Sequence, residues 1–286
     1  NVLLSRLAGG TLTKYPGGTD MASEMERRAE ELRAEGQVAY VIPGGGSNEI
    51  GTLGYAECAL ELMAQADETG LDIDMIVQPT GSSGTHAGMV AGLHVMQSDI
   101  PLLGIGTRAP REKQERMVHD LAVRTLEKVG HDVPLPAERV RAYCDYVGEG
   151  CGIPTAGMVE AVGMLARLEG LLFDPVYSGK ALDGLIDLAR RDFFSGMKNV
   201  VFLHAGGSSA LFAYPGAFDA APAGGLLPPS GPVSVFVHDG SPIHRDDAFR
   251  GRWTVSESTV RADGVVVDAP LLDDDPGLAD GVEDLA

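Results

Sequence analysis

Lysine is scarce in this chain, and positive charge as a whole is outweighed by negative charge. The five lysines are Lys14, Lys113, Lys128, Lys180 and Lys198, arginine is commoner, and the net charge is −19. Such an acidic chain repels phosphate backbones and anionic lipids, which excludes nucleic acid and membranes as general partners. The composition fits a protein from a high-salt cytoplasm or an acidic protein from a GC-rich genome, and it leaves that choice open.

Cysteine pairs and long apolar runs are also missing. Cys58, Cys144 and Cys151 are scattered and form no C-x-x-C pair, so we expect neither disulfides nor a structural zinc site. No stretch of about 18 apolar residues occurs, and the chain begins at Asn1 without the charged and apolar segments of a secretory signal. These absences predict a cytoplasmic enzyme that does not span a membrane.

What the chain does contain is an alternation of helix and strand patterns. Helices are expected over residues 21–35, 55–66, 89–96, 111–129, 155–169 and 179–190, and strands over 38–42, 74–78, 102–105, 139–143 and 200–204. The alternation predicts an α/β fold with an open, mostly parallel sheet and helices on both faces. Because the carboxyl ends of parallel strands meet at one edge, the loops at 43–48, 79–88 and 205–209 should converge there.

The C-terminal part differs in composition. Residues 220–232 are rich in Pro, Gly and Ala and predict a linker, 233–237 and 265–267 could form short strands, and 272–286 are acidic. The polar residues His238, Asp239, His244, Asp246 and Asp247 lack the spacing of a metal site. We therefore expect no metal, and we predict a linker and acidic extension over 220–286 without a chemical role.

The most informative motif is a turn between the strand at 74–78 and the helix after it. It consists of Gly81, Ser82, Ser83, Gly84 and Thr85. Two glycines would let the backbone adopt φ > 0, and the hydroxyls would lie beside N–H groups that the helix start leaves unpaired. With the helix dipole added, the turn is predicted to bind a phosphate without help from lysine or arginine. An ordinary βα turn is the alternative.

Two absent motifs narrow the ligand class. The chain has no GxxxxGK[ST] loop, and residues 44–49 lack the third glycine of the GxGxxG dinucleotide fingerprint. Nucleoside triphosphates and NAD are therefore disfavoured, and another phosphorylated small molecule is preferred.

Several motifs in one order resemble a known enzyme family. They are Tyr40-Val41-Ile42-Pro43 with Gly45-Gly46-Ser47-Asn48, Leu53-Gly54-Tyr55-Ala56-Glu57, Gly84-Thr85-His86-Ala87-Gly88, Asp174-Pro175-Val176-Tyr177-Ser178-Gly179-Lys180 and Gly206-Gly207-Ser208-Ser209-Ala210-Leu211-Phe212-Ala213-Tyr214. Residues 1–218 are similar to D-cysteine desulfhydrase and its relative 1-aminocyclopropane-1-carboxylate deaminase. These are pyridoxal-phosphate enzymes of the tryptophan-synthase-β-like fold. His86, where the deaminase pattern has glutamine, and Phe212-Ala213-Tyr214 favour the desulfhydrase.

The resemblance assigns roles to the turn and to one tyrosine. The turn at 81–85 would hold the cofactor phosphate, and Tyr177 would stack near cofactor and substrate and act in proton transfer or as a nucleophile. A phenol needs a neighbouring cation or hydrogen bonds to act as a base at neutral pH. The alternative for Tyr177 is an ordinary packed aromatic after a proline turn.

Two positions near this predicted site depart from the family pattern. A second active-site tyrosine of the family falls at Cys151, which is either a catalytic thiol or a small filler between glycines. The threonine that faces the pyridine nitrogen in desulfhydrases falls at Ala205. With Gly206, Ala205 would line the cofactor, and Ser178 becomes the nearest candidate to contact that nitrogen, as a milder partner than a carboxylate.

The largest departure concerns the Schiff-base lysine. The family's Gly-Asn-Lys-x-Arg-Lys motif and the Ser-Asn-His segment after it do not occur, and Lys180 does not correspond to that lysine. By resemblance the N-terminal third of the family is missing, so we expect 1–35 to be a remnant of the smaller domain and 36–219 to be the large cofactor-binding domain. The chain by itself is expected to bind the cofactor phosphate weakly and to form no internal aldimine.

The resemblance implies a lyase that acts on a small amino acid. D-cysteine is preferred, with pyruvate, hydrogen sulfide and ammonia as products. The alternatives are the deaminase, which yields 2-oxobutanoate and ammonia; a lyase or racemase for another small amino acid; and a non-catalytic subunit that binds a phosphorylated ligand. A homodimer is expected by resemblance.

Overall fold

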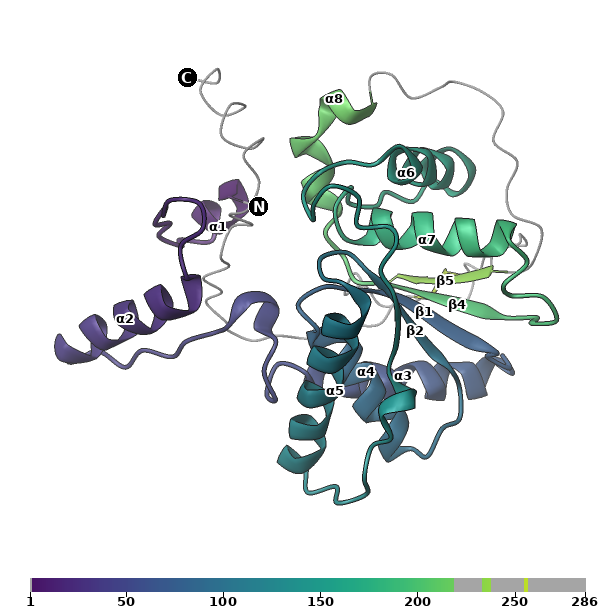
Figure 1. The fold of residues 1–286 in the computed structure, drawn as a ribbon, viewed down its shortest axis with the longest axis horizontal. Helices are drawn as coiled ribbons and strands as arrows, with labels where there is room; N and C mark the ends of the chain where they lie inside the picture. Colours follow the sequence, from purple (N-terminus) through teal and green to yellow (C-terminus); the bar gives the residue numbers. More distant parts are fainter. Residues whose placement is uncertain (1, 219–232, 238–254, 257–286) are drawn as a thin grey trace. The chain divides into compact units, whose positions relative to one another are not determined.

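A computed structural model describes residues 2–218, 233–237 and 255–256 (Figure 1). The described residues divide into two compact units. The smaller unit ends at Gly46, and the larger begins at Ser47.

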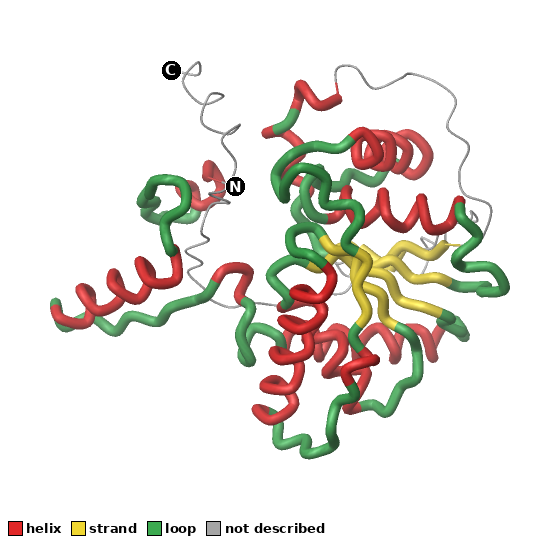
Figure 2. Tube along the Cα trace, in the orientation of Figure 1, coloured by secondary structure: helices red, strands yellow, loops and turns green. Residues whose placement is uncertain are grey.

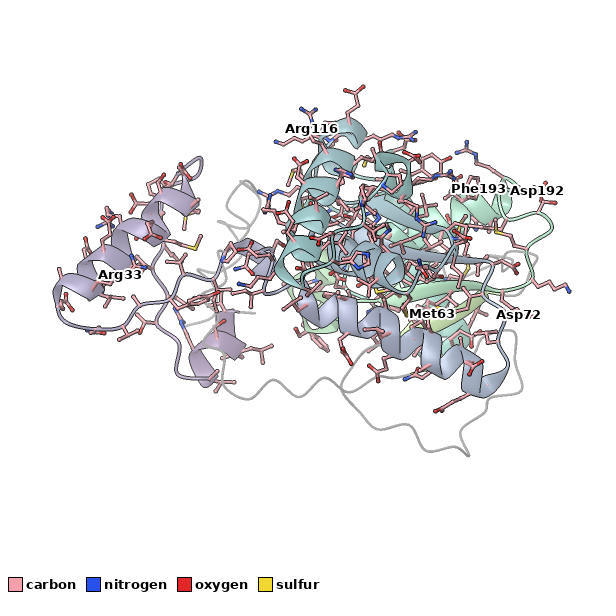
Figure 3. The ribbon with its side chains drawn as sticks, turned by 90° about the horizontal axis from the view of Figure 1, so that it is seen from below. Arg33, Met63, Asp72, Arg116, Asp192 and Phe193 are labelled. Atoms are coloured by element: carbon pink, nitrogen blue, oxygen red, sulfur yellow. The ribbon has the colours of Figure 1, made fainter. Side chains whose placement is uncertain are left out.

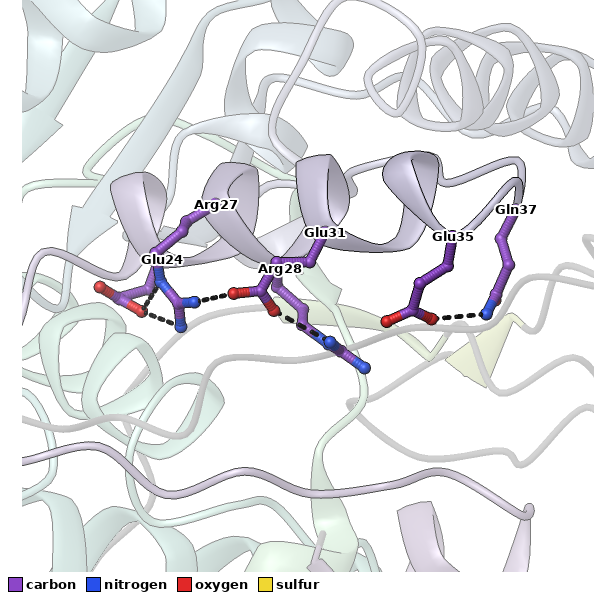
Figure 4. A network of polar contacts seen from close by, with 6 residues as sticks. All are labelled: Glu24, Arg27, Arg28, Glu31, Glu35 and Gln37. Carbon is purple, nitrogen blue, oxygen red and sulfur yellow. Dashed lines mark hydrogen bonds and ion pairs between the residues drawn. The ribbon is translucent and has the colours of Figure 1, made fainter.

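The smaller unit contains the helices α1 (Val2–Leu7) and α2 (Met21–Ala34) and a short 3₁₀ turn, η1 (Gly44–Gly46). Asp20 starts α2, because its carboxylate accepts hydrogen bonds from the N–H groups of Ala22 and Ser23. Figure 4 shows an ion-pair network along α2, in which Arg27 and Arg28 bind Glu24 and Glu31. The arginines and Glu31 are exposed and Glu24 is half-buried, so solvent screens these ion pairs and they contribute little to stability.

The strand predicted at 38–42 is wrong. These residues have no regular secondary structure, and the side chains of Val38 and Tyr40 are exposed. A β-rich run needs a neighbouring strand for its N–H and C=O groups. Among the described residues of the smaller unit no such strand exists.

The larger unit is built around one parallel sheet, drawn in yellow between the helices in Figure 2. Its strands are β1 (Met75–Thr80), β2 (Leu102–Gly106), β3 (Arg141–Tyr143), β4 (Val200–His204), β5 (Val233–Val237) and β6 (Val255–Ser256). Its helices are α3 (Leu53–Thr69), α4 (Gly84–Val95), α5 (Arg111–Lys128), α6 (Ala156–Glu169), α7 (Ser178–Arg190) and α8 (Pro215–Phe218), with 3₁₀ turns η2 (Ala137–Arg139) and η3 (Ser208–Ala213). The strand order is β3-β2-β1-β4-β5-β6, and every pairing is parallel. The predicted α/β fold is confirmed.

Two apolar layers cover the sheet, one on each face. Figure 1 shows α3, α4 and α5 on one side and α6 and α7 on the other. The first layer includes Ile76, Met89, Leu93, Val118 and Leu121, and the second includes Val77, Ile105, Phe173, Leu182 and Phe202. Adjacent residues of β1 enter opposite layers because successive strand side chains alternate in direction.

Helix α4 is enclosed on nearly every side, and two glycines make this possible. A Cβ on Gly92 would lie 2.7 Å from the Cβ of Ala59, and one on Gly88 would lie 2.6 Å from the Cβ of Tyr55. Glycine at both positions therefore lets α3 approach α4 closely. This packing fixes the direction of α4 and hence the place where its first turn meets β1.

Charged side chains lie on the outer surface of the larger unit. Figure 3 shows the side chains of Arg116 and Asp192 at this surface, and both are exposed. Among the described residues no helix has the length and apolarity needed to cross a bilayer. The strand predicted at 233–237 is confirmed as β5, whereas residues 265–267, 272–286 and the polar cluster from His238 to Asp247 lie outside the described part of the chain.

Candidate active site

The site is built where β1 and β4 end. The two strands pair in parallel, with Met75 beside Val200 and Val77 beside Phe202. The loops that follow them, at 79–88 and 205–209, therefore emerge at the same edge of the sheet, as predicted. The third predicted loop, at 43–48, does not follow a strand. Its Ser47, which belongs to the larger unit, contacts the start of α4 through its hydroxyl.

The turn at residues 81–85, called the socket below, has an unexpected backbone. The prediction that its glycines adopt positive φ is wrong: neither Gly81 nor Gly84 does so. The left-handed residue is instead Ser83, with φ 80°. A left-handed serine is energetically unfavourable compared with glycine, so neighbouring contacts must hold it.

The two glycines of the socket serve close approach. A Cβ on Gly81 would lie 2.9 Å from Oγ1 of Thr107 and 3.3 Å from Cε2 of Tyr177. A Cβ on Gly84 would lie 2.8 Å from Oγ of Ser47. Glycine at these positions thus lets two other segments contact the turn directly.

The start of α4 is open to an anion. No side chain of Ser83 caps the helix, and the first turn contains no acidic residue. Within the described chain, the N–H of Gly84 donates to Oγ of Ser47 at 3.2 Å. The next N–H groups, of Thr85 and His86, precede the first i to i−4 hydrogen bond of the helix. With the helix dipole and the hydroxyls of Ser82 and Thr85, these groups suit a phosphate.

The side chain of Gln114, which follows the neighbouring strand β2, forms hydrogen bonds with the socket and with the end of β1. Nε2 of Gln114, at the beginning of α5, donates to Oγ1 of Thr80 at 3.0 Å and to Oγ of Ser83 at 3.1 Å. The N–H of Thr107 donates to the carbonyl of Thr80 at 2.9 Å. Gln114, Thr80, Ser83 and Thr107 are all buried. The loop and helix after β2 therefore fix the turn after β1.

Tyr177 lies directly beside the socket. Its ring faces Gly81, and its hydroxyl donates to the carbonyl of Pro79 at 3.2 Å. Thr85 forms side-chain hydrogen bonds with both Tyr177 and Tyr55, which places a second phenol at this edge. The structure thus brings the predicted socket and the predicted tyrosine together.

The environment of Tyr177 determines its protonation state. Burial raises the pKa of its hydroxyl above the ordinary value of 10, and the nearby Tyr55, Asp174 and Cys151 raise it further, while the Thr85 hydrogen bond opposes this. None of the largest contributions to that pKa comes from a lysine or an arginine. The condition for a basic phenolate is therefore unmet, and Tyr177 carries its proton at neutral pH. In this geometry it is suited to donate a hydrogen bond or a proton.

Ser178 meets Gly206 at the start of α7, and Ala205 precedes Gly206 in the chain. Oγ of Ser178 donates to the carbonyl of Gly206 at 3.0 Å, and Gly206 adopts φ 81°. The buried carboxylate of Asp174 accepts hydrogen bonds from the N–H groups of Val176, Tyr177 and Ser178 at 2.8, 2.5 and 2.7 Å. Asp174 thereby fixes the backbone that presents Tyr177 and Ser178.

Cys151, in the loop at 147–151, and Lys180, in α7, lie next to the site. Cys151 is half-buried and close enough to Tyr177 to raise the pKa of its hydroxyl. Lys180 is completely buried, and its Nζ donates to the carbonyl of Val147 at 2.7 Å and to that of Gly150. Lys180 therefore holds the loop that carries Cys151.

Three residues of this site were missed by sequence reasoning, and each had a signal. Asp174 precedes Pro175 in a quoted motif, and aspartate before a turn commonly accepts a hydrogen bond from the N–H two residues on, here that of Val176. Gln114 is the one amide on the buried stripe of α5, which continues through Val118, Leu121, Ala122, Thr125 and Leu126. Tyr55 belongs to a quoted motif, but its approach to Thr85 depends on the packing of α3 against α4.

The residues present fit the phosphate group of pyridoxal phosphate but not its aldehyde. The uncapped first turn of α4 fits the phosphate, and the neutral Tyr177 lies next to it. The amine that would bind the aldehyde is not evident: Lys14, Lys113, Lys128 and Lys198 are exposed, and the ammonium of Lys180 binds two carbonyls.

Known proteins are similar to this chain in sequence and in fold. A solved structure described as an ACC deaminase homologue has 32% sequence identity and a TM-score of 0.69, with 76% of this chain and 64% of that chain covered. This chain thus spans less than two thirds of that one. An O-ureido-L-serine synthase structure, at 16% identity and a TM-score of 0.50, shares the fold over 77% of this chain and 65% of its own. Residues 1–206 match the family described as pyridoxal-phosphate dependent enzyme, and the chain belongs to that family.

Proposed function

We propose that this chain carries the phosphate-binding and tyrosine part of the active site of a pyridoxal-phosphate lyase for small amino acids. The observation that carries the proposal is the start of α4, where Ser83 provides no side-chain cap and no acidic residue lies in the first turn, beside a neutral tyrosine. The bound cofactor would act as an electron sink for the substrate. The N–H groups of Thr85 and His86 would bind its phosphate, and Tyr177 would hold a proton at its hydroxyl for donation.

D-cysteine is the proposed substrate, with pyruvate, hydrogen sulfide and ammonia as products. The support is the set of motifs around Tyr177 and Gly206 that resemble the desulfhydrase. The ACC deaminase homologue at 32% identity supports 1-aminocyclopropane-1-carboxylate as the alternative substrate. A panel of small amino acids, with sulfide and 2-oxo acid measured separately, distinguishes the two. Release of 2-oxobutanoate without sulfide would favour the deaminase.

A second candidate function is non-catalytic binding of a phosphorylated ligand. The positions of the five lysines favour it. Four are exposed and the fifth is engaged by two carbonyls, so we propose that the chain as given binds the cofactor reversibly and is inactive alone. The test adds pyridoxal phosphate to the full chain, reduces with borohydride and measures intact mass. We expect no lysine adduct and competition by inorganic phosphate. A stoichiometric adduct on one lysine, together with turnover, would overturn inactivity and leave only the enzyme.

The family resemblance also supports a homodimer in the cytoplasm. Sedimentation equilibrium of the full chain tests the assembly, and a single monomeric species over a wide concentration range would contradict it.

A further inference from the structure

The socket contains a conformation that its own sequence does not favour. Ser83 adopts φ 80° immediately before α4, in a region where glycine is the usual residue. The direction of the first N–H groups of α4 depends on this backbone turn. Something outside the turn must therefore keep Ser83 in place when no anion is bound.

Gln114 has the geometry to do this. An amide nitrogen has two hydrogens, and Nε2 of Gln114 uses them on Thr80 and Ser83, which lie on either side of Gly81 and Ser82. Gln114 comes from α5, which is a separate element, and its side chain is completely buried. The side-chain amide of Gln114 thus bridges Thr80, the last residue of β1, and Ser83, the residue before α4.

The backbone of α5 gives this contact a rigid support. The N–H of Gln114 donates to the carbonyl of Pro110 at 2.9 Å, and Thr107 is bonded to the carbonyl of Thr80. Eleven residues further along α5, the hydroxyl of Thr125 binds that of Thr52 at 2.7 Å. Helix α5 therefore contacts the end of β1 near its own start and the residue before α3 near its own end.

We propose that Gln114 is a positioning residue of the anion socket. By binding Thr80 and Ser83 it keeps Ser83 left-handed and the first N–H groups of α4 aimed at the phosphate. This inference rests on the proposed function, because it requires the socket to bind a phosphate group. Gln114 acts through Ser83.

The first test replaces the amide by an isosteric apolar side chain in the full chain. Gln114→Met should weaken binding of inorganic phosphate and of pyridoxal phosphate roughly tenfold, because the turn would no longer be held in advance. Binding is measured by titration calorimetry. His119→Phe is the matched control: it removes the hydrogen bond between the imidazole of the same helix and the carbonyl of Leu135, neither of which contacts the socket, and should leave both affinities unchanged.

A second pair of variants separates positioning from general stability. Glycine adopts φ 80° without strain, so Ser83→Gly should make phosphate binding independent of the glutamine. In the Ser83→Gly background, adding Gln114→Met should change phosphate affinity by less than about twofold. A purely structural role for Gln114 would give the same loss in both backgrounds and would overturn the proposal.

The outcomes distinguish this inference from the proposed function. If the wild-type chain binds neither phosphate nor pyridoxal phosphate, both proposals are overturned. If the wild type binds them and Gln114→Met binds equally well, only the assignment of Gln114 is overturned. Should Gln114→Met fail to fold, Ser83→Ala removes the Oγ acceptor alone and is expected to show the same roughly tenfold loss; unchanged affinity there would also overturn the assignment.

Discussion

Helices α4 and α7 begin at the same edge of the sheet, but their N-termini are treated in opposite ways. Before α7, the carboxylate of Asp174 accepts three backbone N–H bonds. At the start of α4, no acidic residue lies in the first turn and Ser83 provides no cap. Both ends carry the positive pole of a helix dipole. The difference indicates that the start of α7 binds the carboxylate of Asp174, whereas the start of α4 remains available to an anion from outside the protein.

Removing the internal anion should have the largest effect. Asp174→Ala would leave three buried N–H groups without an acceptor, so the free energy of unfolding should fall by roughly 3 kcal/mol in urea denaturation. Asp174→Asn retains one acceptor oxygen and should lose less. Equal stability of wild type and Asp174→Ala would show that α7 does not depend on this carboxylate.

A carboxylate placed at the start of α4 should make this helix start resemble that of α7, which already binds an anion of the protein. Ser82→Asp would put a carboxylate in the socket and weaken phosphate binding roughly a hundredfold through charge repulsion. The unliganded variant should be slightly more stable, by about 0.5 kcal/mol, because the carboxylate interacts with the helix dipole. Ser82→Asn keeps the shape without charge and is the control. Undiminished phosphate binding by Ser82→Asp would place the anion site elsewhere.

Acid should weaken α4 through His86. This imidazole is completely buried, and burial lowers its pKa from 6.5 to about 3. Its contribution to stability is therefore present above pH 6.5 and lost as pH falls towards 3, with a loss of about 2 kcal/mol by pH 5. His86→Gln should reduce that dependence in urea unfolding at pH 7 and pH 5. If the free energy of unfolding depended on pH equally in variant and wild type, the acid loss could not be assigned to His86.

The smallest effect should arise from Asp183 in α7 and should have the opposite pH dependence, because here stability is lost as pH rises. Burial and the carboxylates of Asp187 and Glu160 raise the pKa of Asp183 from 3.8 to about 6, while Arg190 opposes them. The stability that protonated Asp183 provides is complete below pH 4 and is lost as pH rises through 6. After allowance for solvent screening, Asp183→Asn should be more stable than wild type by about 1 kcal/mol at pH 7 and equal to it at pH 4. Thermal unfolding at both pH values tests this.

Elements that depend on local pattern were predicted closely, and those that depend on neighbours were not. The strand expected at 200–204 is β4, and the helix expected at 111–129 is α5, which ends at Lys128. The apolar run at 38–42 was predicted as a strand, yet strand formation needs a partner that local pattern does not supply. Gln114 was placed on a helix, but its role depended on Thr80 and Ser83, which are more than 30 residues away in sequence.

The sequence by itself determined the parallel α/β fold and the position of the turn rich in glycine and serine between β1 and α4. These follow from side-chain periodicity and from motifs that lie within one segment. Only the tertiary structure decided that Ser83 is the left-handed residue, that the pKa of Tyr177 is raised and not lowered, and that Asp174 binds the N–H groups before α7 while Ser83 does not cap α4. Backbone strain, pKa and helix capping at these positions depend on contacts between distant segments.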